Sequence, residues 1–233
     1  MSTTRKFGQI VWHDLMTGDN NKAKQFYADL FDWTYVIEHA TDFVWTQGEA
    51  DYPLIMADGE AHGGFVDIGD SEQTRWLAFV TVDNVDDATN HAKDLRANII
   101  REPFDIPGVG RCSVIEDPQG AQICPFVPSH DYPPPSGVFV QEHLLTPDIE
   151  ASKQFYRDLF DWWNDSGESG VNVSAYTEGS QMPAAWTPCL GTKNTKAMIE
   201  KATSLGAVRI HTEQSAILLE DPTGAQFGLC EIP

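Results

Sequence analysis

The sequence predicts an α+β fold of two tandem copies, in which each copy runs strand, helix and strands, and then repeats that order. A nine-residue phrase occurs twice, as QFYADLFDW at 25–33 and as QFYRDLFDW at 154–162. A second pair of phrases, IEDPQGAQI at 115–123 and LEDPTGAQF at 219–227, follows in the same order. These two pairs divide the chain of 233 residues into two related copies.

The repeated phrase predicts the first helix of each copy. Asp19 and Asp148 are suitable N-caps, and short apolar strands precede both helices at 10–17 and 139–146. The apolar side chains recur at helical spacing in copy one at Ala23, Phe26, Tyr27, Leu30 and Phe31, and in copy two, after the polar Ser152, at Phe155, Tyr156, Leu159 and Phe160. We therefore expect these aromatic residues, with Trp33 and Trp162, to lie in a core.

Residues 75–95 match residues 185–205, and the match aligns Trp76 with Trp186. These two segments begin the second half of each copy. A second helix is predicted where Ala88, Ala92 and Leu95 recur, and each Asp-Pro-x-Gly predicts a tight hairpin turn.

Copy two is expected to be shorter. The offset between the copies is 129 residues at the helix phrase, 25–33 against 154–162, and 104 at the turn phrase, 115–123 against 219–227. Most of the loss falls among the strands after the first helix, where copy one has its Gly63-Gly64 pair.

The boundary between the copies is predicted in VPSHDYPPPSG, because successive prolines favour an extended spacer. The sequence thus predicts an N-terminal domain at 1–128, a proline-rich linker at 129–137 and a shortened C-terminal domain at 138–233.

Charge and composition exclude several partners. The chain has 15 Lys and Arg against 35 Asp and Glu, a net charge of −20, which repels nucleic acids and anionic membrane surfaces. No signal peptide or membrane-spanning run is apparent, so a cytoplasmic location is expected. The cysteines show no CxxC spacing and are expected to be reduced, packed thiols: Cys112, Cys124, Cys189 and Cys230.

The motifs resemble the vicinal oxygen chelate superfamily of glyoxalase I, bleomycin-resistance proteins and extradiol dioxygenases. The pattern from Trp12 to Thr17 before the FYxxLFxW helix, with IPGVGR at 106–111 and DPQGA at 117–121, is most similar to its tandem glyoxalase-like branch. The resemblance implies a βαβββ unit used four times. Each pair of units would form a cupped mixed sheet around a cavity for a small molecule.

The resemblance also implies a divalent metal, held by a His or Gln on the first strand, a His or Glu on inner strands and a Glu on the last strand. Carried over, these positions fall in copy one on Trp12, Leu77 and Cys124, and in copy two on Gln141, Thr187 and Gly228. Only Gln141 and Cys124 keep a donor, so the standard metal site is expected to be lost. A divalent-metal lyase or dioxygenase with other ligands, from Gln141, His143, His62 and Cys124, is the alternative.

Asp14 and His143 are the candidate catalytic residues, because they occupy equivalent places in the two copies and each could act as acid, base or hydrogen-bonding anchor. Strand alternation puts Asp14 on one face with Trp12, and His143 on one face with Gln141. Trp12 and Gln141 are therefore candidate ligand-binding residues. The alternatives are a structural carboxylate at Asp14 and a hydrogen-bonded core histidine at His143.

Three further side chains are candidate ligand contacts. Trp76 and Trp186 could stack on a flat ligand or pack in a core. Arg111, after a Gly-rich loop, could clamp a carboxylate or phosphate, or could pair with Asp105 or Glu102 at the surface.

A weaker metal candidate is His62 with Glu60, beside Gly63-Gly64. The function predicted from the sequence is the binding of a small organic molecule, better formed in the N-terminal domain, with acid/base chemistry on a carbonyl or aromatic compound if it is an enzyme. Sequestration without catalysis is the other alternative. Either a monomer or a homodimer is compatible with two fused domains.

Overall fold

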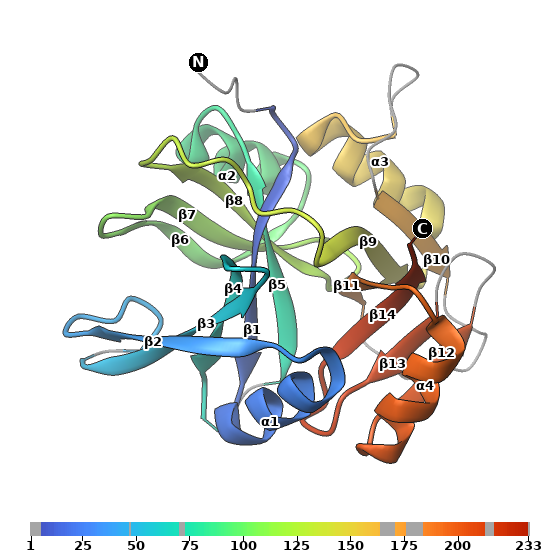
Figure 1. The fold of residues 1–233 in the computed structure, drawn as a ribbon. Helices are drawn as coiled ribbons and strands as arrows, with labels where there is room; N and C mark the ends of the chain where they lie inside the picture. The colour runs from blue at the N-terminus through green and yellow to red at the C-terminus, as the bar shows by residue number, and fades with distance from the viewer. Residues whose placement is uncertain are drawn as a thin grey trace. The chain divides into compact units, whose positions relative to one another are not determined.

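The computed structural model describes residues 6–46, 48–69, 73–163, 171–175, 184–212 and 217–232. The elements of copy one are β1 (Ile10–Thr17), α1 (Asn20–Phe31), β2 (Thr34–Ala40), β3 (Ala50–Ala57), β4 (Glu60–Asp67), β5 (Arg75–Thr81), α2 (Val85–Asp94), β6 (Asn98–Ile106), β7 (Gly110–Glu116) and β8 (Gln122–Pro128) (Figure 1). Those of copy two are β9 (Phe139–Thr146), α3 (Ile149–Phe160), β10 (Val171–Ala175), β11 (Ala185–Thr192), α4 (Thr195–Ser204), β12 (Val208–Thr212), β13 (Ile217–Glu220) and β14 (Gln226–Glu231). The order strand, helix and strands is confirmed for both copies. No helix in the described ranges is long and apolar enough to cross a membrane.

The described strands form two mixed sheets. One has eight strands in the order β2-β3-β4-β1-β5-β8-β7-β6, and the other has six in the order β10-β9-β11-β14-β13-β12. In each half the first strand pairs in parallel with a later one, as β1 does with β4 and β5 with β8. Strands joined by hairpins pair antiparallel, as β2 does with β3 and β7 with β8. This confirms the α+β class. In the described residues, three of the four predicted units have the βαβββ order, and the first half of copy two is described as β9, α3 and β10.

The chain divides into two compact units, and each unit draws on both copies. Unit 1 comprises Met1–Trp12, Leu77–Pro134 and Glu142–Trp186. Unit 2 comprises His13–Trp76, Pro135–Gln141 and Thr187–Pro233. Each unit therefore joins one half of copy one to the other half of copy two. The domain boundaries expected from the sequence stay a prediction.

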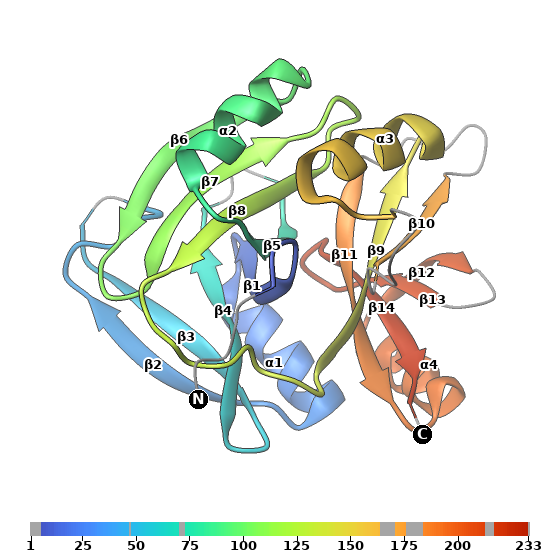
Figure 2. The same ribbon diagram turned by 90° about the horizontal axis from the view of Figure 1, so that it is seen from above.

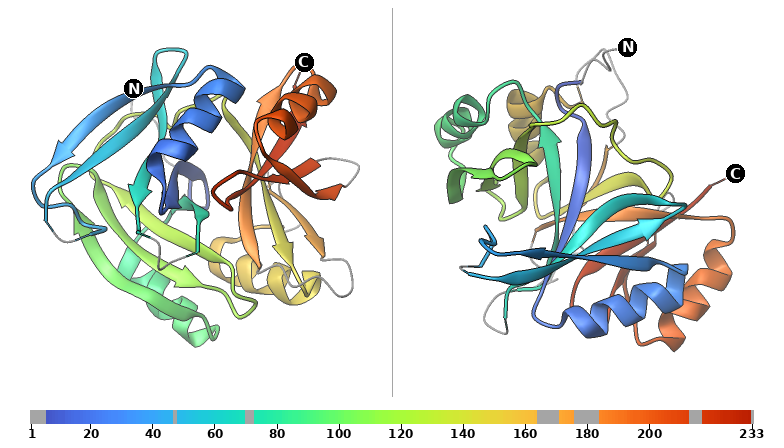
Figure 3. Two further views of the ribbon diagram at one scale, coloured as in Figure 1. Left: turned by 90° about the horizontal axis from the view of Figure 1, so that it is seen from below. Right: turned by 60° about the vertical axis from the view of Figure 1, so that its left-hand side comes forward.

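The core of unit 2 lies around α1 and α4, which run side by side (Figure 3). Tyr27 is fully buried there, between the ring of Trp33 at 5.2 Å and that of Phe227 at 5.7 Å. The core of unit 1 is built alike. There α2 covers β6, β7 and β8 and contacts α3 (Figure 2), and Tyr156 is buried against Trp162.

The repeated phrase encodes both a helix and its termination. Asp19 and Asp148 accept hydrogen bonds at the N-termini of α1 and α3, from the amides of Lys22 and Ala151. At the other ends, the second aspartate of each phrase, Asp32 or Asp161, adopts the left-handed conformation with φ 59°. This reversal returns the following tryptophan to the core. The prediction of core aromatics is confirmed.

The two Asp-Pro-x-Gly turns are held by their own aspartates. The Asp117 Oδ1 accepts from the amides of Gln119 at 2.8 Å and Ala121 at 2.9 Å, and Asp221 does the same two and four residues on. Gly120 completes the turn at φ 104°, which a residue with a side chain rarely adopts. The predicted turns are thus confirmed.

Candidate functional site

The strands of unit 2 carry two different faces. Leu15, Ile55 and Phe65 pack in the core with α1. Because neighbouring residues of a strand point to opposite faces, Asp14 and Gly64 lie on the other face, which we call the inner face of unit 2. The two residues are also paired in register between β1 and β4.

Asp14 is buried on this inner face, at 2% exposure, and is held by a tyrosine. The Tyr52 hydroxyl donates to Asp14 Oδ1 at 2.6 Å, a short hydrogen bond of the charge-assisted kind. The ring of Tyr52 lies over Gly64, where an added Cβ would come within 2.1 Å of it. Phe43 lies beside it, with ring centroids 5.9 Å apart. Gly64 therefore makes the room that lets Tyr52 reach Asp14.

Sequence reasoning did not single out Tyr52. A signal was present, because a glycine inside a strand often marks the close approach of another group. The Gly63-Gly64 pair was noted, and Tyr52 lies on the strand that pairs with it.

The two histidines of these strands, His13 and His62, make different contacts. The ring of His13 stacks on Phe139 at 4.0 Å, and Phe139 packs against the core of unit 2, so His13 faces α1 as strand alternation predicts. His62 is buried, and its Nε2 lies 3.2 Å from the carbonyl oxygen of Ala57. Glu60 is exposed. The structure therefore gives no support to His62 and Glu60 as a ligand pair.

The second candidate, His143, is buried on β9, in register with Asn172 of β10. Its neighbour Leu144 packs in the core of unit 1, so His143 points to the opposite face. Asp14 lies in the eight-stranded sheet and His143 in the six-stranded one, so the two candidates do not share a sheet. The catalytic roles stay predictions.

Trp12 and Gln141 differ in their surroundings. Trp12 is partly buried on β1. Gln141 is also partly buried, and its Oε1 accepts a weak hydrogen bond from the Cys230 thiol at 3.7 Å. Their ligand-binding roles stay predictions.

Trp76 and Trp186 are core residues with one polar contact each. Their indole Nε1 atoms donate to tyrosine hydroxyls, Trp76 to Tyr27 at 3.2 Å and Trp186 to Tyr156 at 2.8 Å. Both tryptophans are buried, at 3% and 2% exposure. Of the two alternatives in the sequence, packing matches this placement.

These tyrosines also meet the buried turn aspartates. Tyr156 interacts with Asp117 in unit 1, and Tyr27 interacts with Asp221 in unit 2. Burial raises the pKa of both carboxyl groups and of both tyrosine hydroxyls. Each unit therefore contains a buried chain of aspartate, tyrosine and tryptophan.

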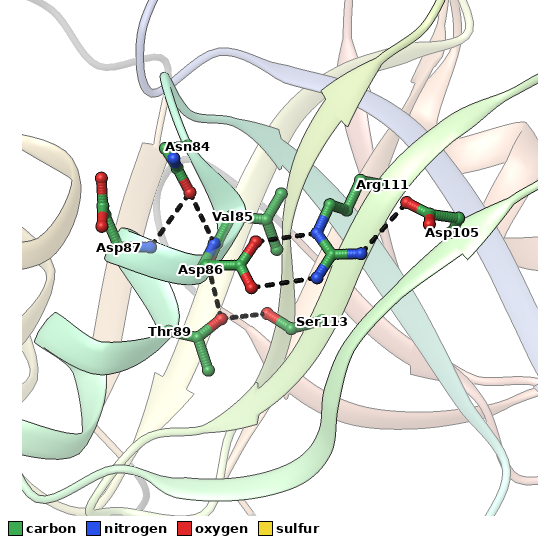
Figure 4. Close-up of polar contacts among 8 residues, drawn as sticks. All are labelled: Asn84, Val85, Asp86, Asp87, Thr89, Asp105, Arg111 and Ser113. Atoms are coloured by element: carbon green, nitrogen blue, oxygen red, sulfur yellow. Dashed lines mark hydrogen bonds and ion pairs between the residues drawn. The ribbon is translucent and has the colours of Figure 1, made fainter.

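Arg111 is paired at the surface of unit 1 (Figure 4). Its Nε and Nη2 donate to the two carboxylate oxygens of Asp86 at 2.8 and 2.9 Å, and its Nη1 donates to Asp105 at 3.1 Å. The hydrogen bonds to these two carboxylates raise the pKa of Arg111. The predicted surface pair with Asp105 is confirmed, and Asp86 was not anticipated. The guanidinium is thus already bound by carboxylates of its own chain.

Unit 1 has an inner face of its own, opposite α2. Ser113 Oγ lies 2.8 Å from Thr89 Oγ1 of α2, and Ile115 packs in the core beneath that helix. Cys112 and Val114 alternate with them along β7 and therefore point the other way. Both are buried, and the same face of β5 and β8 carries the buried residues Leu77, Phe79, Cys124 and Phe126. The expectation of packed, reduced cysteines is confirmed for all four, which are buried and are not disulfide-bonded.

Arg101 of β6 also lies on the inner face of unit 1. It is paired in register with Val114, and Phe104 is paired with Cys112, so both belong to this face. The guanidinium carbon of Arg101 is 3.5 Å from the centroid of the Phe104 ring, a cation–π contact. Burial lowers the pKa of Arg101, which is partly buried. Sequence reasoning missed Arg101, although its strand pairs with the one that carries Arg111.

The residues at the family's metal positions do not fit a divalent ion. In copy one, Trp12 and Leu77 offer no donor, and Cys124 is fully buried. In copy two, an added Cβ at Gly228 would lie 2.5 Å from Cys189 Sγ, so the space of a glutamate is filled. Among the residues that the structure describes, no three His, Cys, Asp or Glu side chains group closely enough to hold a metal ion.

Two hollows on unit 1 lie elsewhere. One, of about 290 Å³, is lined by the end of α2, the Pro118 turn and α3, and the other, of about 200 Å³, by the segment around Phe7 and the ends of β5 and β8. Neither is lined by a candidate residue predicted from the sequence.

Two mixed sheets, built from half-copies that each carry a single helix after their first strand, match the fold of the glyoxalase superfamily. The sequence model of the Glyoxalase/Bleomycin resistance protein/Dioxygenase superfamily matches residues 6–124. That match covers more than half of the chain, which therefore belongs to this superfamily.

The relatives carry different names. The chain is 24% identical over 251 residues to CFP32 of Mycobacterium tuberculosis, provisionally named a glyoxylase, covering 95% of this chain and 94% of that protein. It is 24% identical over 259 residues to the anthracycline biosynthesis protein DauV of Streptomyces sp. strain C5, covering 97% and 94%. A Mn(II)-bound glyoxalase from Novosphingobium aromaticivorans has a similar fold, with a TM-score of 0.61 at 14% identity over 97% of this chain and 82% of that one.

Proposed function

We propose that this protein binds a small organic molecule on the inner face of unit 2, with Asp14 and Tyr52 as its polar anchor. The observation that carries the proposal is the 2.6 Å hydrogen bond between the Tyr52 hydroxyl and the buried Asp14 carboxylate. Burying a carboxylate is costly, and the strand position facing Tyr52 is a glycine, whose small size lets the tyrosine approach.

The two groups offer complementary chemistry to a ligand. A carboxylate accepts hydrogen bonds from a hydroxyl or amide, whereas a tyrosine hydroxyl can both donate and accept. A compound with a carbonyl or hydroxyl group on an apolar body would match Asp14, Tyr52 and the neighbouring Phe43. If the protein is an enzyme, Asp14 is the candidate base and Tyr52 the candidate acid for proton transfer on such a compound.

The test uses 2-naphthamide, whose two amide N–H groups can donate to the Asp14 carboxylate and to the Tyr52 hydroxyl oxygen. Equilibrium dialysis is expected to detect binding to the native protein, and Tyr52→Phe should weaken it about tenfold, since hydrogen bonds to charged groups are worth about 1.5–3 kcal/mol. The matched control is Tyr132→Phe, because Tyr132 is 78% exposed. Equal losses in both variants, or no effect of Tyr52→Phe, would contradict the proposal.

The same experiment separates binding from catalysis. Mass spectrometry of the recovered probe shows whether it leaves the complex unchanged, as a sequestration protein would leave it. Elemental analysis of protein purified without chelator tests the rival metal enzyme. We expect less than one equivalent of Fe, Mn, Ni or Zn, and a stoichiometric metal would overturn the metal-independent part of the proposal.

A further inference from the structure

The larger hollow on unit 1, of about 290 Å³, is walled by parts of both copies. The end of α2 and the Pro118 turn come from copy one, and α3 comes from copy two (Figure 2). Asp117 fixes the turn, and His91 Nε2 of α2 lies 3.2 Å from the carbonyl oxygen of Asp158 of α3, so the walls are held in place. The volume is close to the lower end of the range usual for small-molecule sites, about 300–1,000 Å³.

Much of the lining is apolar. Phe155 of α3 is buried in the core of unit 1, and Leu95 at the end of α2 packs against that core. Pro118 and Ala151 complete the apolar part of the lining. Removing apolar surface from water is favourable, by an amount that grows with the area covered. The hollow therefore favours a ligand with an apolar body.

Asp158 is the charged member of this lining. Its Oδ1 accepts a hydrogen bond from the Gln154 amide at 2.8 Å, one helical turn earlier, which orients the carboxylate along α3. A carboxylate has about four positions for accepting hydrogen bonds, so it can bind a ligand donor at the same time. Arg157, which donates to Gln154 Oε1 at 3.2 Å, lies outside the lining. Leu95 ends α2, and the C-terminal end of a helix dipole is negative, so both walls favour a cation.

The equivalent place in unit 2 differs by one cationic side chain. The repeated helices align without gaps, so Ala151 corresponds to Lys22 and Asp158 to Asp29. Both aspartates accept a hydrogen bond from the glutamine four residues before them, at 2.8 Å in copy two and 2.9 Å in copy one. The carboxylate is thus common to both copies, whereas the hollow has a small alanine where copy one has a lysine.

We propose that this hollow binds a small organic amine, whose apolar body lies against Phe155 and Leu95 and whose ammonium group binds the Asp158 carboxylate. An ammonium group supplies the positive charge and the hydrogen-bond donors that a lysine would bring to this place. The net charge of −20 also favours the approach of cations. The site is separate from Asp14 and Tyr52, which belong to unit 2.

The experiment measures the binding of 2-naphthylmethylamine, which is positively charged near neutral pH, beside that of neutral 2-naphthamide. Equilibrium dialysis at low salt is carried out on the native protein and on Asp158→Asn, Ala151→Lys and Asp29→Asn. Asp158→Asn should weaken amine binding about threefold, the scale of an ion pair at an exposed carboxylate, and leave 2-naphthamide binding unchanged. Ala151→Lys should weaken amine binding about tenfold, because the lysine stem covers the apolar lining and its ammonium group repels the probe.

Asp29→Asn is the matched control. Asp29 has the same place in the repeated phrase and the same glutamine contact, and it lies outside the hollow. This variant should bind the amine like the native protein. Asp158 and Ala151 are exposed, and asparagine keeps an oxygen for the Gln154 amide, so both variants are expected to fold, which circular dichroism checks.

Native affinity for the amine in either Asp158→Asn or Ala151→Lys would overturn the proposal. So would an equal loss in Asp29→Asn, an equal loss of the neutral probe in Asp158→Asn, or absence of amine binding to the native protein at millimolar concentration. The proposed function is tested by the effect of Tyr52→Phe on 2-naphthamide, so each of the two proposals can fail without the other.

Discussion

Each copy has a strand glycine beside which another side chain fills the space of a Cβ, and the kind of side chain differs between the copies. In copy one, the space above Gly64 is taken by the ring of Tyr52, whose hydroxyl reaches Asp14. In copy two, the space above Gly228 is taken by the Sγ of Cys189, and a Leu218 methyl group lies 3.1 Å from the added Cβ. The first glycine makes room for a polar pair and the second for apolar packing. This contrast is consistent with the proposal that the polar anchor of the binding site lies in copy one.

The turn aspartates and helix tyrosines that the two copies share have a structural role. Asp117 of copy one meets Tyr156 of copy two, and Asp221 of copy two meets Tyr27 of copy one. Each interaction therefore joins a turn of one copy to a helix of the other. Duplication has preserved the residues that interlock the copies, whereas Asp14 and Tyr52 belong to one copy alone.

The largest expected effect comes from separating the copies. Because each compact unit takes one half from each copy, a fragment of residues 1–128 lacks half of both cores. We expect this fragment, and the fragment 138–233, to lack a cooperative thermal transition when measured alone by circular dichroism. Mixing the two should restore it, if the copies complement each other. A fragment that melts cooperatively by itself would show that one copy is an independent domain.

Substitution of the two glycines should have the next largest effect. Gly64→Ala and Gly228→Ala each place a Cβ too close to a neighbour, so each should destabilise the fold by about 1–3 kcal/mol, measured by urea unfolding. The affinity for 2-naphthamide should distinguish the two variants. Gly64→Ala is expected to weaken 2-naphthamide binding because it displaces Tyr52, whereas Gly228→Ala should leave binding intact.

Double substitutions check the cause of each loss. Adding Cys189→Ala to Gly228→Ala should recover part of the stability, because the clashing sulfur is removed. Cys189→Ala should not rescue Gly64→Ala. Additive losses in both cases would mean that the glycines are needed for another reason.

Sequence reasoning succeeded where a pattern repeats and is local. The helix phrase, its Asp19 and Asp148 caps and the Asp-Pro-x-Gly turns each depend on residues within a few positions, and the structure has them as predicted. The pairing of each unit from two copies depends on contacts over more than a hundred residues, which no local pattern carries.

The candidate site was predicted less well for the same reason. Asp14 was found because a strand alternates, but its partner Tyr52 lies 38 positions away and is brought in by the room above Gly64. Arg111 was singled out because it follows a Gly-rich loop, and Arg101 was not considered. Only the register of β6 with β7 shows which arginine faces the buried side chains.

A smaller effect is expected from the buried turn aspartates. Burial raises the pKa of Asp117 and Asp221 above their ordinary value of 3.8. For a carboxyl group whose pKa is raised on folding, the folded state holds the proton more tightly, so its contribution to stability is present at low pH. That contribution is lost as the pH rises through the folded pKa. Asp117→Asn and Asp221→Asn should thus destabilise the protein by about 1 kcal/mol at pH 4 and by less at pH 7.

Thermal melts of each variant and the native protein across this pH range measure the difference. The two copies should respond alike, since both carboxyl groups meet an equivalent tyrosine. A destabilisation that grows with pH in either variant would mean that its aspartate acts as an ionised group. Asp86→Asn is the control with the opposite sign, because the hydrogen bond from Arg111 lowers the pKa of Asp86. The stability that Asp86 contributes is lost as the pH falls.

The smallest effect is expected from Arg111→Gln. Although Arg111 contacts Asp86 and Asp105, all three side chains reach solvent, and exposed ion pairs contribute little because water and salt screen them (Figure 4). Asp86 also lies in the first turn of α2, where the helix dipole favours a carboxylate without the arginine. We expect a melting temperature close to that of the native protein, and a rise in the pKa of Asp86 in an NMR titration. A large loss of stability would mean that Arg111 fixes β6 and β7 onto α2 and is not merely a surface residue.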